Sequence, residues 1–192
     1  MERALSSELT TVPGGIFAKT IDDFDSLVRQ HRPRVFRFML ASLRDREAAE
    51  NLTQDCFVRA YQARSQSRGA ASAGTWLMHI AANLMRDHAG SARLKFWTRN
   101  LRHDVDLADI GDYIPDRQRS PEAITSAREQ VAAVWQAAEK LSERQRTVLL
   151  LRFVEDMDLL EIAAVTGMKE GTVKTHLFRA LAAVRAELEK RK

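Results

Sequence analysis

One stretch near the C-terminus, residues 170–188, carries the side chains best suited to bind another molecule. Arginine and lysine can donate to guanine O6 and N7 or to phosphate, threonine can donate, accept or offer a methyl group, and phenylalanine can pack on a thymine methyl. The pattern predicts a helix that enters the major groove of duplex DNA, with a solvated basic surface helix as the alternative. At helical spacing its outward face carries Thr172, Thr175, Arg179 and Ala182, flanked by Lys174, His176 and Phe178.

Two helices joined by a tight turn are expected to position that face. Asp158 is suited to cap the first helix, with Glu161 three residues later to complete a capping box. Gly167 falls where this helix must end, because glycine tolerates the left-handed conformation. We expect the second helix to begin near Glu170, which gives a helix-turn-helix. The apolar positions repeat at helical spacing: Leu159, Ile162, Ala163 and Val165, then Val173, Leu177, Ala180, Leu181, Val184 and Leu188.

The residues before this pair predict two further helices. Ser120, Pro121 and Glu122 provide a cap, a first-turn proline and a favourable charge for a helix that continues to about Leu141. Ser142 and Gln145 form the next capping box. The helix that follows is apolar on too many sides for a surface helix, because it carries residues 148–151 and Phe153, so we expect it to be central.

The N-terminal half also has helical periodicity throughout. We expect a short helix after Asp22, a second opened by Pro33, a third capped by Asp45 that runs to about Ala63, and a fourth capped by Thr75. Glycine and small polar residues at 64–74 indicate a loop before the fourth helix. The expected buried stripes are Phe24, Leu27 and Val28; Val35, Phe36, Met39, Leu40 and Leu43; Ala49, Leu52, Cys56 and Ala60, with Phe57 and Tyr61 alongside; and Trp76, Leu77, Ile80, Ala81 and Leu84. The fold class is therefore all-α.

Composition limits the possible environments and partners. The chain of 192 residues has a net charge of +4 and a pI of about 9.5, which suits a polyanionic partner without requiring one. Its single cysteine, Cys56, excludes an internal disulfide and a cysteine-rich zinc site, and a cytoplasmic setting is expected. No stretch has the character of a signal peptide or a membrane-spanning segment.

Two regions are expected to lie outside the helical domains. Residues 1–20 are rich in Ser, Thr, Pro and Gly, so we expect a mobile tail. Residues 98–120 carry repeated aspartates and one proline, as is typical of a flexible acidic linker between two small domains. Just before the linker, basic residues around Phe96 and Trp97 could bind a nucleic-acid backbone with unstacked bases, or the two rings could cover the end of the bundle.

Three motifs in this order resemble the extracytoplasmic-function group of bacterial sigma-70 factors. They are AAENLTQDCFVRAY at 48–61, TWLMHIAANLMRD at 75–87, and LSERQRTVLLLRF with EIAAVTGMKEGTVKTHLFRAL within 141–181. The resemblance covers about residues 22–97 and 121–188. It implies a region 2 domain at 21–97, the linker at 98–120 and a region 4 domain at 121–192.

The resemblance also implies partners and sites. Such proteins bind core RNA polymerase, direct it to promoters and are commonly held inactive by an anti-sigma factor; no cofactor or metal is implied. The residues that match polymerase docking are Asn51, Leu52, Gln54, Asp55, Phe57 and Arg59. Those that match opening of the −10 element are Arg68, Thr75, Trp76, His79 and Asn83. Those that match reading of the −35 element are Thr172, Lys174, Thr175, His176, Phe178 and Arg179.

Some positions depart from the family pattern. Asn51 stands where the family usually has an acidic residue, and small residues replace aromatic ones before Thr75. His176 stands where arginine is frequent. Lys169 precedes the DNA-reading helix where a small residue or proline is usual, so it gives no side-chain cap.

Three other classes of protein share single features with this sequence. The segment EGTVKTHL also resembles the DNA-binding module of response regulators, which would make the chain a dimeric transcriptional regulator with an α/β receiver. Residues 22–97 have helical rather than strand periodicity, which disfavours this. The five histidines show no spacing for a nucleophile, metal or phosphate loop, so an enzyme is not expected. A helical protein that binds only proteins would leave the Thr175–Arg179 face without a use.

Overall fold

The computed structural model describes residues 21–64, 72–90 and 121–190, and this part of the chain forms seven helices and no strand. The predicted all-α class is confirmed. The helices are α1 (Ile21–Leu43), α2 (Arg46–Ala63), α3 (Ala73–Gly90), α6 (Pro121–Glu139), α7 (Glu143–Phe153), α8 (Leu159–Thr166) and α9 (Glu170–Glu189).

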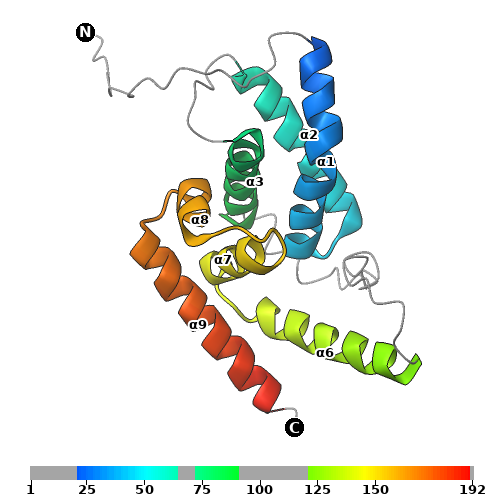
Figure 1. The fold of residues 1–192 in the computed structure, drawn as a ribbon, viewed down its shortest axis with the longest axis vertical. Coiled ribbons are helices and arrows are strands. Elements are labelled where there is room, and N and C mark those ends of the chain that lie inside the picture. The colour runs from blue at the N-terminus through cyan, green and yellow to red at the C-terminus, as the bar shows by residue number, and fades with distance from the viewer. Residues whose placement is uncertain (1–20, 65–71, 91–120, 191–192) are drawn as a thin grey trace.

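The helices of the two halves pack against each other (Figure 1). In the N-terminal half, α1, α2 and α3 are in mutual contact, and in the C-terminal half α9 packs on α6, α7 and α8. The halves meet where α8 lies on α3 and where α7 contacts α1 and α3. The molecule therefore has one contact surface that joins segments far apart in the sequence.

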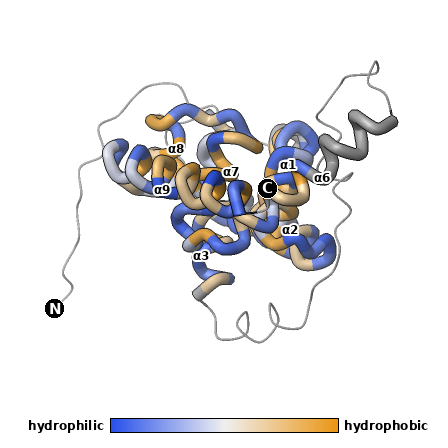
Figure 2. The backbone as a smooth tube through the Cα atoms, turned by 90° about the horizontal axis from the view of Figure 1, so that it is seen from below, coloured by the Kyte–Doolittle hydropathy of each residue, from blue (hydrophilic) through white to orange (hydrophobic). Residues whose placement is uncertain are grey.

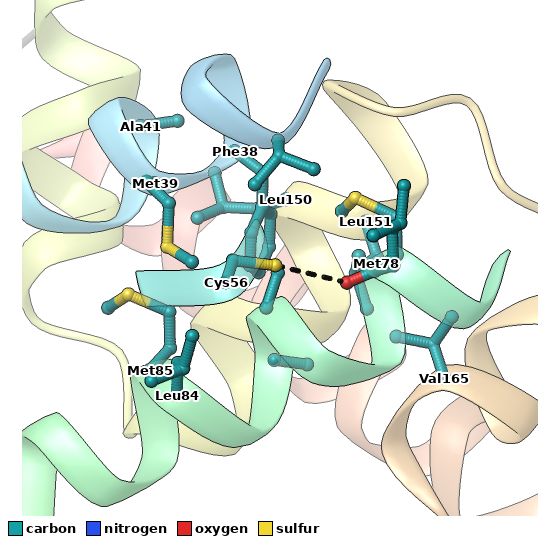
Figure 3. Packing of buried hydrophobic residues seen from close by; sticks show 14 of the residues in the cluster. Phe38, Met39, Ala41, Cys56, Met78, Leu84, Met85, Leu150, Leu151 and Val165 are labelled. Atoms are coloured by element: carbon teal, nitrogen blue, oxygen red, sulfur yellow. Dashed lines mark hydrogen bonds between the residues drawn. The ribbon is translucent and has the colours of Figure 1, made fainter. Parts of the chain in front are cut away.

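A single apolar core continues across this surface. Its fully buried side chains come from both halves, including Phe38 and Met39 of α1, Met78 of α3, Leu151 of α7 and Val165 of α8 (Figure 3). A smaller cluster joins α6, α7 and α9 through Ala137, Ala138, Leu141, Leu149, Ala180 and Val184. Both α7 and α9 contribute to the two clusters, α9 through Val173 in the larger one. Because α7 also contacts α1 and α3, it connects the two halves directly.

The expectation that α7 is central is confirmed for most of its length. Figure 2 shows α7 between α9 and α1, in agreement with the contacts of these helices. Residues 148–151 are buried. Phe153 is an exception: it was expected to be buried, but it is 62% exposed.

Four predicted helix ends are confirmed by side-chain hydrogen bonds or backbone geometry. Asp45 accepts from the Ala48 amide at 3.0 Å, and both Ser142 with Gln145 and Asp158 with Glu161 form reciprocal capping boxes. Gly167 ends α8 in the left-handed region with φ 70°. The local chemistry at these positions is strong enough to fix the helix ends.

The predicted boundary at Pro33 is wrong, because α1 continues through it as one helix of 23 residues. Proline removes one backbone N–H donor and crowds the preceding turn, at a cost of about 3 kcal/mol. Phe24 and Leu27 before Pro33, and Val35 and Phe38 after it, are all buried. Burial of these large side chains on both sides outweighs the proline penalty, at roughly 1.5–3 kcal/mol each.

The predicted start of the fourth helix at Thr75 is also wrong, because α3 begins at Ala73. Ser72 supplies the cap: its Oγ accepts from the Thr75 amide at 3.1 Å and lies 2.9 Å from the Thr75 hydroxyl. The earlier start places Gly74 in the first turn, where a Cβ would lie 3.1 Å from Nη1 of Arg34. The absence of a side chain at Gly74 therefore allows α3 to approach α1 closely.

Several expectations concern residues outside the described part of the chain. These are the mobile tail at 1–20, the acidic linker at 98–120, the basic and aromatic segment around Phe96, and the cap at Ser120. Among the helices that are described, none is long and apolar enough to cross a membrane.

Candidate DNA and polymerase interfaces

The outward face of α9 has the composition and exposure of a DNA-reading surface. Thr172, Thr175, Arg179 and Ala182 are all exposed, as predicted, and Phe178 is 75% exposed. Arg179 has no ion-pair partner among the described residues. An aromatic ring and a cation held outward on a well-packed helix can bind base edges and phosphate.

Two residues on the flanks of α9 are less available than their types indicate. Lys174 pairs with Glu170 one turn earlier, at 2.6 Å. His176 is only half-exposed, and its buried Nδ1 has no hydrogen-bond partner within the described residues.

Leu181 was expected on the buried face but is 40% exposed, so the apolar stripe of α9 is narrower than its spacing predicts.

The turn before α9 has the geometry expected of a helix-turn-helix. Gly167 adopts φ 70°, and its amide donates to the Ala163 carbonyl at 2.9 Å. Lys169 precedes α9 with an extended backbone and no side-chain cap, as predicted. The Thr172 and Val173 amides donate to the Lys169 carbonyl. The Glu170 and Gly171 amides receive no side-chain cap from Lys169, and amides at this end of a helix can bind phosphate oxygens.

The residues expected to bind polymerase lie on the outer side of α2. Asn51, Gln54, Asp55 and Arg59 are exposed, and Leu52 is half-buried. Phe57 is only 8% exposed, so it contributes to the core and to the floor of a hollow rather than to an open surface.

That hollow lies between α1 and α2 and has a volume of about 570 Å³. Its lining includes Val58 and Tyr61, which are 48% and 37% exposed and which the sequence interpretation did not place here. The ring of Tyr61 is held edge-on to Phe24, with centroids 5.1 Å apart. Val58 could have been recognised, because it is an apolar residue on the otherwise polar face of α2.

The residues expected to open the −10 element lie on α3, except for Arg68, which is outside the described residues. Thr75, Trp76, His79 and Asn83 follow one another along the helix. The side chains of Trp76 and His79 are partly buried, and Trp76 packs against the main core. The structure brings these four together on one helix, but not on a freely accessible face.

A chain of hydrogen bonds ties this face of α3 to α8. His79 Nδ1 lies 2.7 Å from the Val165 carbonyl oxygen, which can only accept, so Nδ1 carries the proton. His79 Nε2 then accepts from the Asn83 amide at 3.0 Å, and Asn83 Oδ1 accepts from Arg86 at 2.6 Å. The sequence interpretation identified His79 and Asn83 but not their partner 86 residues away.

A buried carboxylate completes the contact between the halves. The side chain of Glu155 is fully buried, and it accepts from Arg34 Nε at 2.8 Å and from Arg37 Nε at 3.1 Å. Both arginines are on α1, and about a quarter to a third of each side chain is exposed. No local pattern predicts this cluster, because its members are 118 and 121 residues apart.

Within the described residues, no group of three or more His, Cys, Asp or Glu side chains could hold a metal ion. The described residues present two exposed polar faces, on the outside of α9 and on the outside of α2, and a third group of candidate residues lies on the face of α3 that α8 covers. These features define an all-α protein that combines a helix-turn-helix with a second helical unit that has its own polar face.

Comparison with known proteins identifies both units. The model of the family "Sigma-70 region 2" matches residues 27–94, and that of "Sigma-70, region 4" matches residues 132–184. The RNA polymerase sigma-H factor of Pseudomonas aeruginosa is 32% identical over 170 residues, which are 86% of each chain. The ECF RNA polymerase sigma factor SigW of Bacillus subtilis is 26% identical over 168 residues, 87% of this chain and 89% of SigW.

Solved structures share the fold. CnrH, in complex with the cytosolic domain of CnrY, matches with a TM-score of 0.64 at 23% identity and covers 91% of this chain and 92% of CnrH. RpoE of Bartonella quintana, in complex with the anti-sigma factor NepR, matches with a TM-score of 0.60 at 18% identity and covers 88% of this chain and 98% of RpoE. The chain belongs to the extracytoplasmic-function group of the sigma-70 family of RNA polymerase sigma factors.

Proposed function

We propose that this chain binds core RNA polymerase through the outer side of α2 and directs it to promoters through α3 at the −10 element and α9 at the −35 element. The observation that carries the proposal is that a region 2 unit and a region 4 unit occur in one chain, each with an exposed polar face on a helix whose opposite side is buried. This function requires binding by the chain and no catalysis by it, and it would place the protein in the cytoplasm with the polymerase.

The residues of α9 support the assignment to duplex DNA. Arg179 and Phe178 point outward from a helix whose Val173, Ala180 and Val184 are buried. A rigidly packed helix fixes the positions of these two side chains before they meet the groove. A response-regulator-type regulator is not favoured, because the described residues of the N-terminal half, 21–64 and 72–90, contain no strand of a receiver domain.

An anti-sigma protein is the expected regulator. CnrH and RpoE were solved in complex with CnrY and with the anti-sigma factor NepR, respectively. We propose that this chain is held inactive by a protein of that kind, which would compete for faces that polymerase or DNA must reach.

Run-off transcription with purified core polymerase on a pool of random promoter fragments tests the proposal. We expect transcripts only when the chain is added, and their start sites should share two sequence elements upstream. If the chain initiates from no fragment, the proposed function is wrong.

A charge reversal on α2 tests the docking face. Asp55 is exposed, and Asp55→Lys should reduce capture of core polymerase at least tenfold in a pull-down, because a partner surface that is complementary to an aspartate would repel a lysine at the same position. Binding to −35 duplex should be unchanged. Glu189→Lys is the matched control, since it makes the same charge change at an exposed position at the end of α9. Equal capture of the Asp55→Lys variant and the control would contradict the α2 assignment.

A further inference from the structure

His176 carries an unsatisfied polar atom on the helix that is proposed to read the −35 element. Its Nδ1 is buried and has no hydrogen-bond partner within the described residues. A buried polar atom without a partner costs free energy, so such atoms in native proteins call for an explanation. The other ring nitrogen, Nε2, is not among the buried atoms and makes no hydrogen bond with the described residues. The two nitrogens of this ring therefore have different surroundings.

The burial of Nδ1 determines which nitrogen of the neutral ring carries the proton. A neutral imidazole has one N–H donor and one acceptor. A proton on Nδ1 of His176 would be a buried donor without an acceptor, and orphaned donors are rarer in protein interiors than under-satisfied acceptors. His79 has the opposite arrangement, because its Nδ1 donates to the Val165 carbonyl oxygen at 2.7 Å. His176 thus presents an Nε2–H donor to the outside of α9.

His176 lies on the boundary between the buried and the exposed face of α9. Val173 and Ala180, three residues before it and four after it, are buried. Thr172 and Arg179, four residues before it and three after it, are exposed. Residues three and four apart are neighbours on a helix, so Thr172, His176 and Arg179 form a row along one edge. When a helix lies in the major groove, its edges are the parts nearest to the two sugar-phosphate backbones that bound the groove.

Other donors on α9 are already engaged within the helix. Lys174, on the opposite edge, pairs with Glu170 at 2.6 Å. Thr175, near the centre of the outward face, donates its hydroxyl proton to the Gly171 carbonyl oxygen at 2.8 Å. Three candidates for −35 binding keep donors that have no partner within the described residues, all on one edge: Thr172, His176 and Arg179.

We propose that His176 donates its Nε2–H to a phosphate oxygen of one strand of the −35 duplex, and that it does so as a neutral group. This inference rests on the proposed function of α9. A neutral donor displaces no counterion from the DNA, whereas each charged contact does. The contact therefore fixes the orientation of α9 on the backbone without adding to the salt dependence of binding.

Two variants separate the roles of the ring nitrogens. The amide nitrogen of glutamine can take the place of Nε2, and that of asparagine the place of Nδ1. His176→Gln should bind the −35 duplex within about twofold of the parent chain, and His176→Asn about fivefold more weakly, which is the size of one hydrogen bond. Fluorescence anisotropy measures both on a promoter recovered by run-off transcription, at about pH 8, above the range in which histidine titrates. Circular dichroism verifies that each variant is folded.

Changes to the DNA locate the acceptor. Methylphosphonates, introduced one at a time along both strands, replace an anionic phosphate oxygen with a methyl group. At the contacted phosphate, the parent chain should lose affinity and bind no better than His176→Asn does. At every other phosphate the difference between the two should persist. 7-Deazapurines, which lack N7, should leave the difference unchanged at every base.

An arginine at the same position tests the claim of neutrality. His176→Arg should steepen the slope of log K against log salt concentration by about one unit, because the guanidinium displaces a counterion. His176→Gln should keep the slope of the parent chain. Gln30→Arg, which adds the same charge at an exposed position on α1, is the control and should not change the slope.

Nitrogen NMR of the free chain tests the tautomer without DNA. We expect the proton of the His176 ring on Nε2, and a proton on Nδ1 would overturn the inference. Equal affinities of the folded His176→Gln and His176→Asn variants would also overturn it. So would a difference between parent and His176→Asn that only a 7-deazapurine removes, since His176 would then contact a base. Failure of the proposed function has another signature: the parent chain itself would bind the −35 duplex no better than an unrelated duplex.

Discussion

Arg179 is the residue whose chemistry can be resolved most directly, because it is exposed in the middle of the outward face of α9. If it donates to a guanine, Arg179→Ala should weaken binding to the cognate −35 duplex by about 1–3 kcal/mol and relax the preference at one base pair. Arg185→Ala, an exposed arginine farther along the same helix, is the matched control. Fluorescence anisotropy on the cognate duplex and single-base variants measures both. Equal loss on every duplex would instead make Arg179 a phosphate contact.

Cys56 gives a second test at the scale of one residue. Burial raises the pKa of its thiol to about 12, and its Sγ lies 3.7 Å from the Leu77 carbonyl oxygen. Because only the thiolate reacts, Cys56 should be inert to a thiol-specific disulfide reagent at pH 8 in the folded chain and react fully in urea. The unfolded thiol ionises near its ordinary pKa of 9.0, so stability should fall as the pH rises from about 9 towards 12. Rapid labelling of the native protein at pH 8 would show that α2 and α3 separate readily.

At the scale of elements, the two glycines that flank the start of α9 should respond oppositely to alanine. Gly167 has φ 70°, so Gly167→Ala should cost about 1–2 kcal/mol although the added methyl meets no neighbour. Gly171 is helical and also has open space around it, so Gly171→Ala should stabilise the chain by up to about 1 kcal/mol. Urea denaturation measures both changes. Stabilisation of the chain by Gly167→Ala would contradict the left-handed turn, and destabilisation by Gly171→Ala would contradict the open helical position.

Sequence alone predicted the helix ends that depend on short-range chemistry. Asp158 with Glu161, Ser142 with Gln145, and Gly167 each act within a few residues, so their spacing was sufficient. At Pro33 the interpretation failed, because a local breaking signal was outweighed by burial on both sides of it. At Thr75 two good capping residues stood three positions apart, and the structure uses the first, because the Ser72 Oγ accepts from the Thr75 amide.

At the scale of the molecule, the sequence predicted two helical units but not that they share a core. The residues that join them, such as His79 with Val165 and Arg34 with Glu155, are separated by 86 and 121 residues and carry no periodic signal. A polar residue that bonds to a distant partner has the same local pattern as one that faces solvent. The sequence therefore predicted which residues of α3 are suited to bind DNA. It did not predict that α8 covers them.

A shared core has a thermodynamic signature. Because Met78 of α3 and Leu151 of α7 are buried in the same cluster, the two halves should unfold together in one calorimetric transition. Arg34→Glu/Arg37→Glu should divide it into two transitions, since each half then unfolds independently. Arg29→Glu should retain one. Two transitions already present in the parent chain would contradict a common core.

The position of α7 in both clusters has one more consequence. If α7 and α8 were separated from α1 and α3, the apolar side chains of their common cluster would face water, and surfaces of this kind promote aggregation. An opened chain in the absence of any binding partner should therefore be short-lived, lost to precipitation or to proteases. The lifetime of the protein in the cell would then follow the supply of polymerase ready to receive it.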